Sequence, residues 1–99
     1  DREFAGILKS FLQYEGGRVD LDTWTEDALR RISRLRERDG NNEFYLLAHA
    51  HICLLGQRME EAKWLLESYN YNRFAIGKDV ELSSYYLYLT TLLSNDSIG

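Results

Sequence analysis

Hydrophobic residues recur at intervals of three and four along most of the chain, which is the spacing that places side chains on one face of an α-helix. The chain contains no proline, so glycine and asparagine must separate the helices. The pattern predicts an all-α fold. Its five predicted helices cover about residues 2–14, 24–39, 43–55, 59–69 and 80–94.

Residues typical of helix ends accompany two of these segments. Asp22 or Thr23 suits the N-cap of the second helix, because a short polar side chain can accept a bond from a free backbone N–H. Gly40 predicts a left-handed stop at the end of that helix. Asn41 or Asn42 is expected to cap the third helix in the same way.

Two predicted helices are more hydrophobic than an ordinary surface helix. Segment 43–55 is apolar on nearly every side, which predicts a central helix with neighbours on several faces. Segment 80–94 has a stripe of hydrophobic residues and further ones around it, more than one neighbouring helix pair can cover. We therefore expect self-association through this last helix, most simply as a two-fold homodimer.

The chain also contains an internal repeat. Ala28 and Ala62 stand 34 residues apart, inside the matching segments Trp24–Leu29 and Arg58–Lys63. A period near 34 is typical of stacked helical hairpins, which bury their apolar faces on one another and leave extended surfaces for partners. The repeat thus favours binding over catalysis.

The segment Leu47–His51, followed by Gly56 and then by Met59–Ala62, resembles a tetratricopeptide repeat. Phe44 and His51 would take the two aromatic places. Ala48 and Ala62 would lie where the two helices of a hairpin cross closely. The resemblance covers about two and a half repeats and implies a right-handed array of antiparallel helix pairs over residues 1–99. The turn between the third and fourth helices is two residues longer than the family's.

The resemblance also implies a concave groove lined by the first, third and fifth helices. An extended peptide or a partner helix would bind there. Carried over by register, the groove residues are Lys9 and Gln13, then Tyr45, His49, Ile52 and Cys53, then Ser84, Leu87 and Tyr88.

Other architectures and functions stay open. The same helices could form another antiparallel bundle. The domain could be a structural spacer or an oligomerisation segment of a larger bacterial-type protein. A third function is weak binding of an anion or nucleic acid through Arg30, Arg34 and Arg38, which share one face of the second helix. That ridge is more typical of a solvated face, where Glu26 could pair with Arg30.

Charge and cysteine content narrow these alternatives. The net charge of −4 argues against nucleic acid as the main partner. A single cysteine cannot form an internal disulfide, which fits a reducing compartment, and no apolar run approaches the length of a membrane span. We expect a cytoplasmic domain without membrane contact. The chain starts at Asp1 and reads as a piece of a longer protein.

Candidate chemistry is sparse. His49 and Cys53 share a helix face at i, i+4, where two zinc ligands could sit, but no second Cys/His pair supplies the remaining ligands. A Cys/His nucleophile would also need an orienting group and an oxyanion pocket. Glu60, Glu61 and Glu67 are interpreted as structural acids near a helix N-terminus. We expect a protein that is not an enzyme and has no metal or other cofactor.

Overall fold

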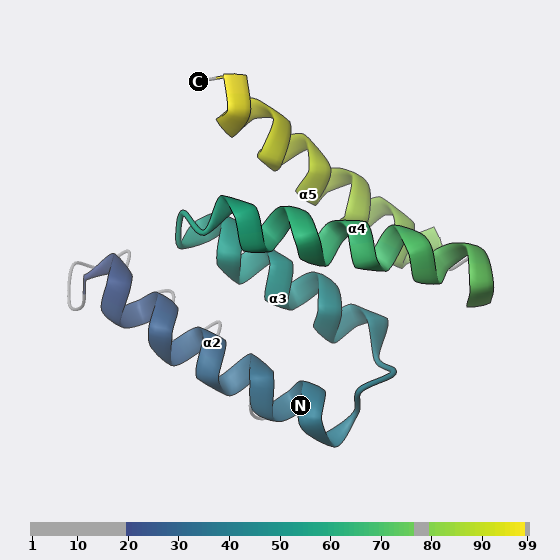
Figure 1. Ribbon diagram of the computed structural model, residues 1–99, viewed down its shortest axis with the longest axis horizontal. Coiled ribbons are helices and arrows are strands. Elements are labelled where there is room, and N and C mark those ends of the chain that lie inside the picture. The colour runs from purple at the N-terminus through teal and green to yellow at the C-terminus, as the bar shows by residue number, and fades with distance from the viewer. Residues whose placement is uncertain (1–19, 77–79, 99) are drawn as a thin grey trace.

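The computed structural model describes residues 20–76 and 80–98, with side chains over 20–69 and 82–95, and every regular element in these ranges is an α-helix (Figure 1). The all-α prediction is therefore confirmed for the described part of the chain. The predicted helix at 2–14 lies outside the described residues. The four helices are α2 (Leu21–Arg38), α3 (Glu43–Leu55), α4 (Met59–Ile76) and α5 (Val80–Ile98).

The helix boundaries agree with the hydrophobic pattern in part. Both ends of α3 and the first residues of α4 and α5 lie where the spacing predicts them. Both α4 and α5 continue beyond the predicted ends at residues 69 and 94. Asparagine, aspartate and serine cost a helix only up to about 0.7 kcal/mol each relative to alanine, so they do not end a helix by themselves.

The predicted N-cap of α2 and the predicted left-handed stop at Gly40 were both wrong. Its N-cap is Asp20, whose Oδ1 accepts a 2.7 Å hydrogen bond from the backbone N–H of Thr23. That backbone bond is the main reason why the pKa of Asp20 lies below its usual range. The helix begins at Leu21, because this residue packs its side chain on the core. At the other end the Asp39 N–H donates to the Leu35 carbonyl, and Gly40 does not adopt the left-handed conformation.

The predicted cap of α3 is confirmed at Asn42. Its side-chain oxygen accepts a 3.2 Å bond from the backbone N–H of Tyr45. Replacing Asn42 by alanine should lower the free energy of unfolding by about 1 kcal/mol, because that N–H loses its side-chain acceptor and keeps only the Asn42 carbonyl, at 3.1 Å. Urea denaturation followed by circular dichroism measures the change. The matched control is Asn41→Ala at the exposed neighbour, and an equal loss in both variants would show that the cap is not the cause.

The central position predicted for α3 is confirmed. It contacts α2, α4 and α5, and α4 in turn packs on α5 (Figure 1). Two hydrophobic clusters lie on different sides of it. The cluster towards α2 contains Trp24, Ala28, Ile32, Leu35, Ala48 and Ile52. The cluster towards α4 and α5 contains Leu46, Leu47, Ala50, Cys53, Leu54, Ala62, Leu65, Leu66, Tyr69 and Leu89. Because α3 supplies residues to both, it joins the two halves of the core.

The alanines of the internal repeat are all buried, but one predicted pairing was wrong. Ala28 and Ala62 are fully buried in the separate clusters. Ala48 packs with α2, so it does not meet Ala62 as expected. Ala50, two residues further along, is the small α3 residue in the cluster of Ala62. The move from Ala48 to Ala50 is two residues, and the turn between α3 and α4 is also two residues longer than in the tetratricopeptide family.

The turn between α3 and α4 depends on a close contact with α2. A Cβ atom at Gly56 would lie 2.4 Å from Oγ1 of the buried Thr25, so only glycine fits there. The left-handed position is the next residue, Gln57, at φ 65°. The Gln57 N–H bonds to Leu54 and the Arg58 N–H to Cys53, as in a Schellman motif. Arg58 also forms an ion pair with Glu26, which ties the turn to α2 at a second point and replaces the expected Glu26–Arg30 pair.

No helix in the described ranges combines the length and the apolar character that crossing a bilayer requires.

Candidate functional site

The residues predicted to line one groove do not share one surface in the structure. Tyr45 and Ile52 pack with the cluster towards α2, and Ile52 is buried. Cys53 is fully buried on the α4 side, and His49 lies mostly covered near it. Ile52 and Cys53 therefore cannot contact a partner directly, and the prediction was wrong for both. Lys9 and Gln13 lie outside the described residues.

The three predicted residues of α5 form a continuous exposed face. Ser84, Leu87 and Tyr88 are all exposed, as is Thr91, and their spacing places the four on one side of the helix. Leu87 is 59% exposed and Tyr88 is 53% exposed. Adjacent exposed hydrophobic side chains on one helix face are typical of a surface that contacts a partner. This α5 face is one candidate for function.

Aromatic side chains connect the edge of the α5 face to α3. Nδ1 of His51 is 2.9 Å from the hydroxyl of Tyr85, and the two rings meet edge to face with centroids 5.7 Å apart. The ring of Tyr88 lies 5.9 Å from His51 on the same side, and Phe44 lies 5.7 Å from Tyr85. Burial lowers the pKa of His51 and raises that of Tyr85, so both groups are neutral at pH 7. These contacts hold Tyr88 in place beside α3.

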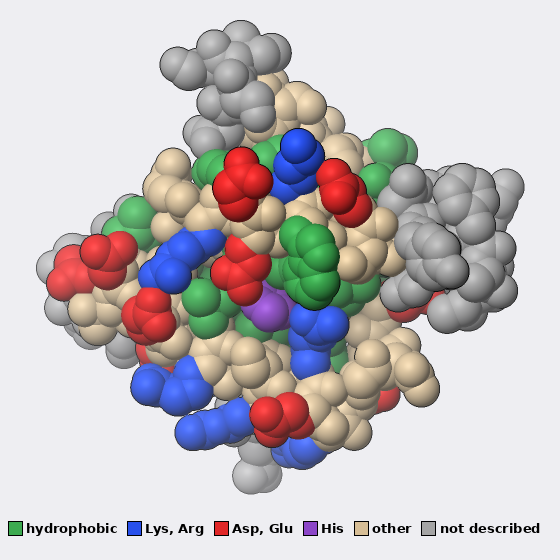
Figure 2. All heavy atoms as spheres, viewed as in Figure 1, with side chains coloured by type: hydrophobic (Ala, Val, Ile, Leu, Met, Phe, Trp, Pro, Cys, Tyr) green, Lys and Arg blue, Asp and Glu red, His purple; other side chains and the backbone are tan. Residues whose placement is uncertain are grey.

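A second candidate is a polar cluster that joins α2, α3 and α4. The Arg36 guanidinium lies 2.9 Å from His49 Nδ1, and His49 Nε2 lies 3.6 Å from Oε1 of Glu61. Cys53 follows His49 by one helical turn and faces the same carboxylate. Figure 2 shows a histidine at the centre of one face of the molecule, with acidic, basic and hydrophobic side chains around it.

The contacts of His49 determine which ring nitrogen carries its proton. A guanidinium group only donates hydrogen bonds, so Nδ1 must accept from Arg36 and the proton must be on Nε2, towards Glu61. Burial is the main reason why the pKa of His49 is lowered, and the Arg36 charge lowers it further, while Glu61 opposes both. His49 is therefore neutral at pH 7.

Cys53 is held as a thiol in this cluster. Burial, assisted by the nearby Glu61 carboxylate, raises the pKa of Cys53 to about 12. A thiol of that kind is a poor nucleophile. It can still bind a metal, since a cation displaces the proton, and the ligand atoms of His49, Cys53 and Glu61 all lie within 4.8 Å of one another. The sequence pattern identified the first two residues. It missed Glu61, which comes from the next helix.

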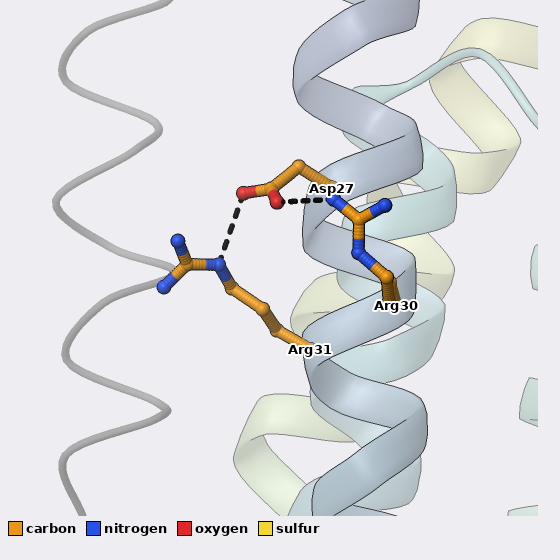
Figure 3. A network of polar contacts seen from close by, with 3 residues as sticks. All are labelled: Asp27, Arg30 and Arg31. Atoms are coloured by element: carbon orange, nitrogen blue, oxygen red, sulfur yellow. Dashed lines mark hydrogen bonds and ion pairs between the residues drawn. The ribbon is translucent and has the colours of Figure 1, made fainter.

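Two of the arginines of α2 pair with an acidic side chain of the same helix. Arg30 and Arg31 both bond to the carboxylate of Asp27, at 2.7 and 3.0 Å, as Figure 3 shows. Partial burial raises the pKa of Asp27, but the bonds and charges of the two arginines outweigh it and hold that pKa below its usual range. The Asp27 carboxylate thus neutralises part of the positive charge of the ridge formed by Arg30, Arg34 and Arg38. The ridge is a weaker anion site as a result.

Comparison with known proteins assigns the chain to a sequence family. No curated protein and no solved structure matches it. One family does match, over residues 2–98. Because the match extends over nearly the whole sequence, the chain belongs to the family of unknown function DUF5717, as its N-terminal domain.

Proposed function

We propose that the chain is a tetratricopeptide-like interaction domain that binds a helix of a protein partner on the exposed face of α5. In this proposal the domain is a non-enzymatic scaffold. The binding surface differs from the groove that the sequence resemblance implied, since the α3 residues of that groove face α2 and α4.

The contacts between helices support a repeat of 34 residues. His51 of α3 and Tyr85 of α5 are separated by that interval. Nδ1 of His51 forms a hydrogen bond with the hydroxyl of Tyr85. Ala28 and Ala62, at the same interval, are both fully buried. A contact and a shared burial at this interval are what stacked helical hairpins would produce.

The observation that carries the proposal comes from applying this interval to α3. Ala50, Cys53 and Leu54 are buried in the cluster that packs on α4 and α5. Adding 34 to each residue number gives 84, 87 and 88, which are three of the four exposed residues of the α5 face. In α3 these positions are covered by α4 and α5. In α5 the same positions are uncovered, with serine in place of alanine and two large hydrophobic residues after it.

The composition of the α5 face indicates what it would bind. Ser84, Leu87, Tyr88 and Thr91 carry no charge, so the face suits the apolar side of another helix. Tyrosine combines a large contact area with a hydroxyl that can bond at the edge of an interface. A second copy of the chain is the simplest such partner, because two uncharged faces meet without electrostatic repulsion.

Self-association tests the proposal directly. The wild-type chain should form dimers as its concentration rises, and Leu87→Glu should abolish them, because dimerisation would bury the new charge. Sedimentation velocity over a concentration series measures both. Lys63→Glu, at an exposed position of α4, is the matched control and should still dimerise. A wild type that stays monomeric at high concentration would contradict a self-complementary α5 face and favour a closed helical bundle.

A further inference from the structure

The polar cluster at the centre of one face of the molecule contains three residues that are not part of the α5 face. His49 and Cys53 lie one turn apart on α3, and the Gly56 turn brings Glu61 of α4 against them. From this arrangement we propose that His49, Cys53 and Glu61 form a binding site for a divalent transition metal of the zinc class.

The distances within the cluster are close to those of a metal site. Zinc bonds of about 2.0–2.3 Å at tetrahedral angles place neighbouring ligand atoms about 3.3–3.7 Å apart. His49 Nε2 and Glu61 Oε1 already lie 3.6 Å apart, while the widest separation among the three ligand atoms is within 4.8 Å. Small rotations of the three side chains would close the remaining difference of about 1 Å, and a water molecule would complete the tetrahedron.

The donor atoms select the kind of metal. Thiolate and imidazole bind zinc, cobalt and similar ions, whereas calcium and magnesium take oxygen ligands almost alone. The thiolate of Cys53 and the carboxylate of Glu61 would together balance the charge of a divalent ion. Because α3 and α4 are joined through the core, the backbones that carry the ligands are already in place.

Binding requires two changes in protonation. The Cys53 thiol loses its proton to solvent as the metal–sulfur bond forms. The proton of His49 moves from Nε2, which takes the metal, to Nδ1, which must then release Arg36. One proton is therefore released to solvent for each ion bound. Arg36 thus competes with the metal, through its charge and through its bond to Nδ1.

Titration of the full chain with Co²⁺ tests this site. Bound Co²⁺ should give a thiolate-to-cobalt charge-transfer band and visible ligand-field bands, and Zn²⁺ should displace it. Glu61→Gln should weaken binding about tenfold or more, whereas Glu60→Gln at the exposed neighbouring position should leave it unchanged. Cys53→Ala should remove the charge-transfer band. Circular dichroism confirms that each variant is folded.

The Arg36→Gln variant separates a metal site from a structural polar cluster. It removes the competing charge and supplies an oxygen that can accept the Nδ1 proton, so Co²⁺ should bind about tenfold or more tightly. A purely structural role for the cluster would give no such gain. The proposal is overturned if no charge-transfer band forms, or if Glu61→Gln and Glu60→Gln bind Co²⁺ equally.

Discussion

Replacing Trp24 by alanine should lower the free energy of unfolding by about 3–5 kcal/mol, the largest effect we expect from a single substitution in this chain. Trp24 is only 2% exposed and is among the largest fully buried side chains in the described residues. It packs with Ala28 and Ile32 of its own helix and with Ala48 and Ile52 of α3. These neighbours are held in two packed helices and can relax only partially into the cavity that alanine would leave.

Urea denaturation followed by circular dichroism measures this loss. Tryptophan fluorescence provides an independent check, because the second tryptophan, Trp64, is 64% exposed and can be replaced by phenylalanine at little cost. In Trp64→Phe the remaining emission should come from a buried ring and shift to the red on unfolding. An emission maximum that is already typical of water, and does not move, would contradict the burial of Trp24.

Gly56→Ala should destabilise the protein by about 1–3 kcal/mol, the second largest effect we expect. The added Cβ would lie 2.4 Å from Oγ1 and 2.5 Å from Cγ2 of Thr25, which is buried and bonded to the Leu21 carbonyl. Either α2 or the turn must then move. The backbone of Gly56, at φ −86°, is open to any residue, so the loss would come from packing alone.

A double-mutant cycle with Thr25→Ala tests that cause. This change removes the two nearest atoms, so the pair Gly56→Ala and Thr25→Ala should cost less than the sum of the single variants. Gly40→Ala is the matched control: its Cβ would meet only the Arg36 carbonyl, at 3.4 Å, and stability should stay the same or rise slightly. Strict additivity of the two losses would rule out the proposed clash.

Hydrophobic periodicity predicted the core far better than it predicted the surface. The stripe of α2 and the central place of α3 could be predicted, because burial repeats every three to four residues. Helix ends were less certain, since Asp20 and Asp22 are both good caps. The choice between them depends on Leu21, whose packing against the core is a tertiary contact.

The groove prediction failed for Ile52 because α2 covers it and for Cys53 because α4 and α5 cover it. The register of the predicted groove was also inconsistent between repeats. Shifted back by 34, the α5 residues correspond to positions 50, 53 and 54, whereas the groove prediction used 45, 49, 52 and 53. Successive residues of an α-helix point about 100° apart around its axis. A register that is wrong by one or two residues therefore selects a different face of the helix. Only Cys53 and Leu87 correspond.

The polar cluster shows a different limit of sequence reasoning. His49 and Cys53 could be paired from their spacing, because one helical turn separates them. Glu61 could not be added, since its position depends on how α4 folds back on α3, and Arg36 arrives from a third helix. Contacts within one helix can be predicted from spacing, while contacts between helices depend on the length and geometry of the turns.

The contact between Thr25 and Gly56 also constrains how the family can vary. The two positions are 31 residues apart in sequence but share one small space, so neither can enlarge unless the other shrinks. Related sequences should therefore substitute them together: an alanine or serine at position 56 should occur with a residue smaller than threonine at position 25. Glu26 and Arg58, which join the same helix to the same turn, should exchange charges as a pair.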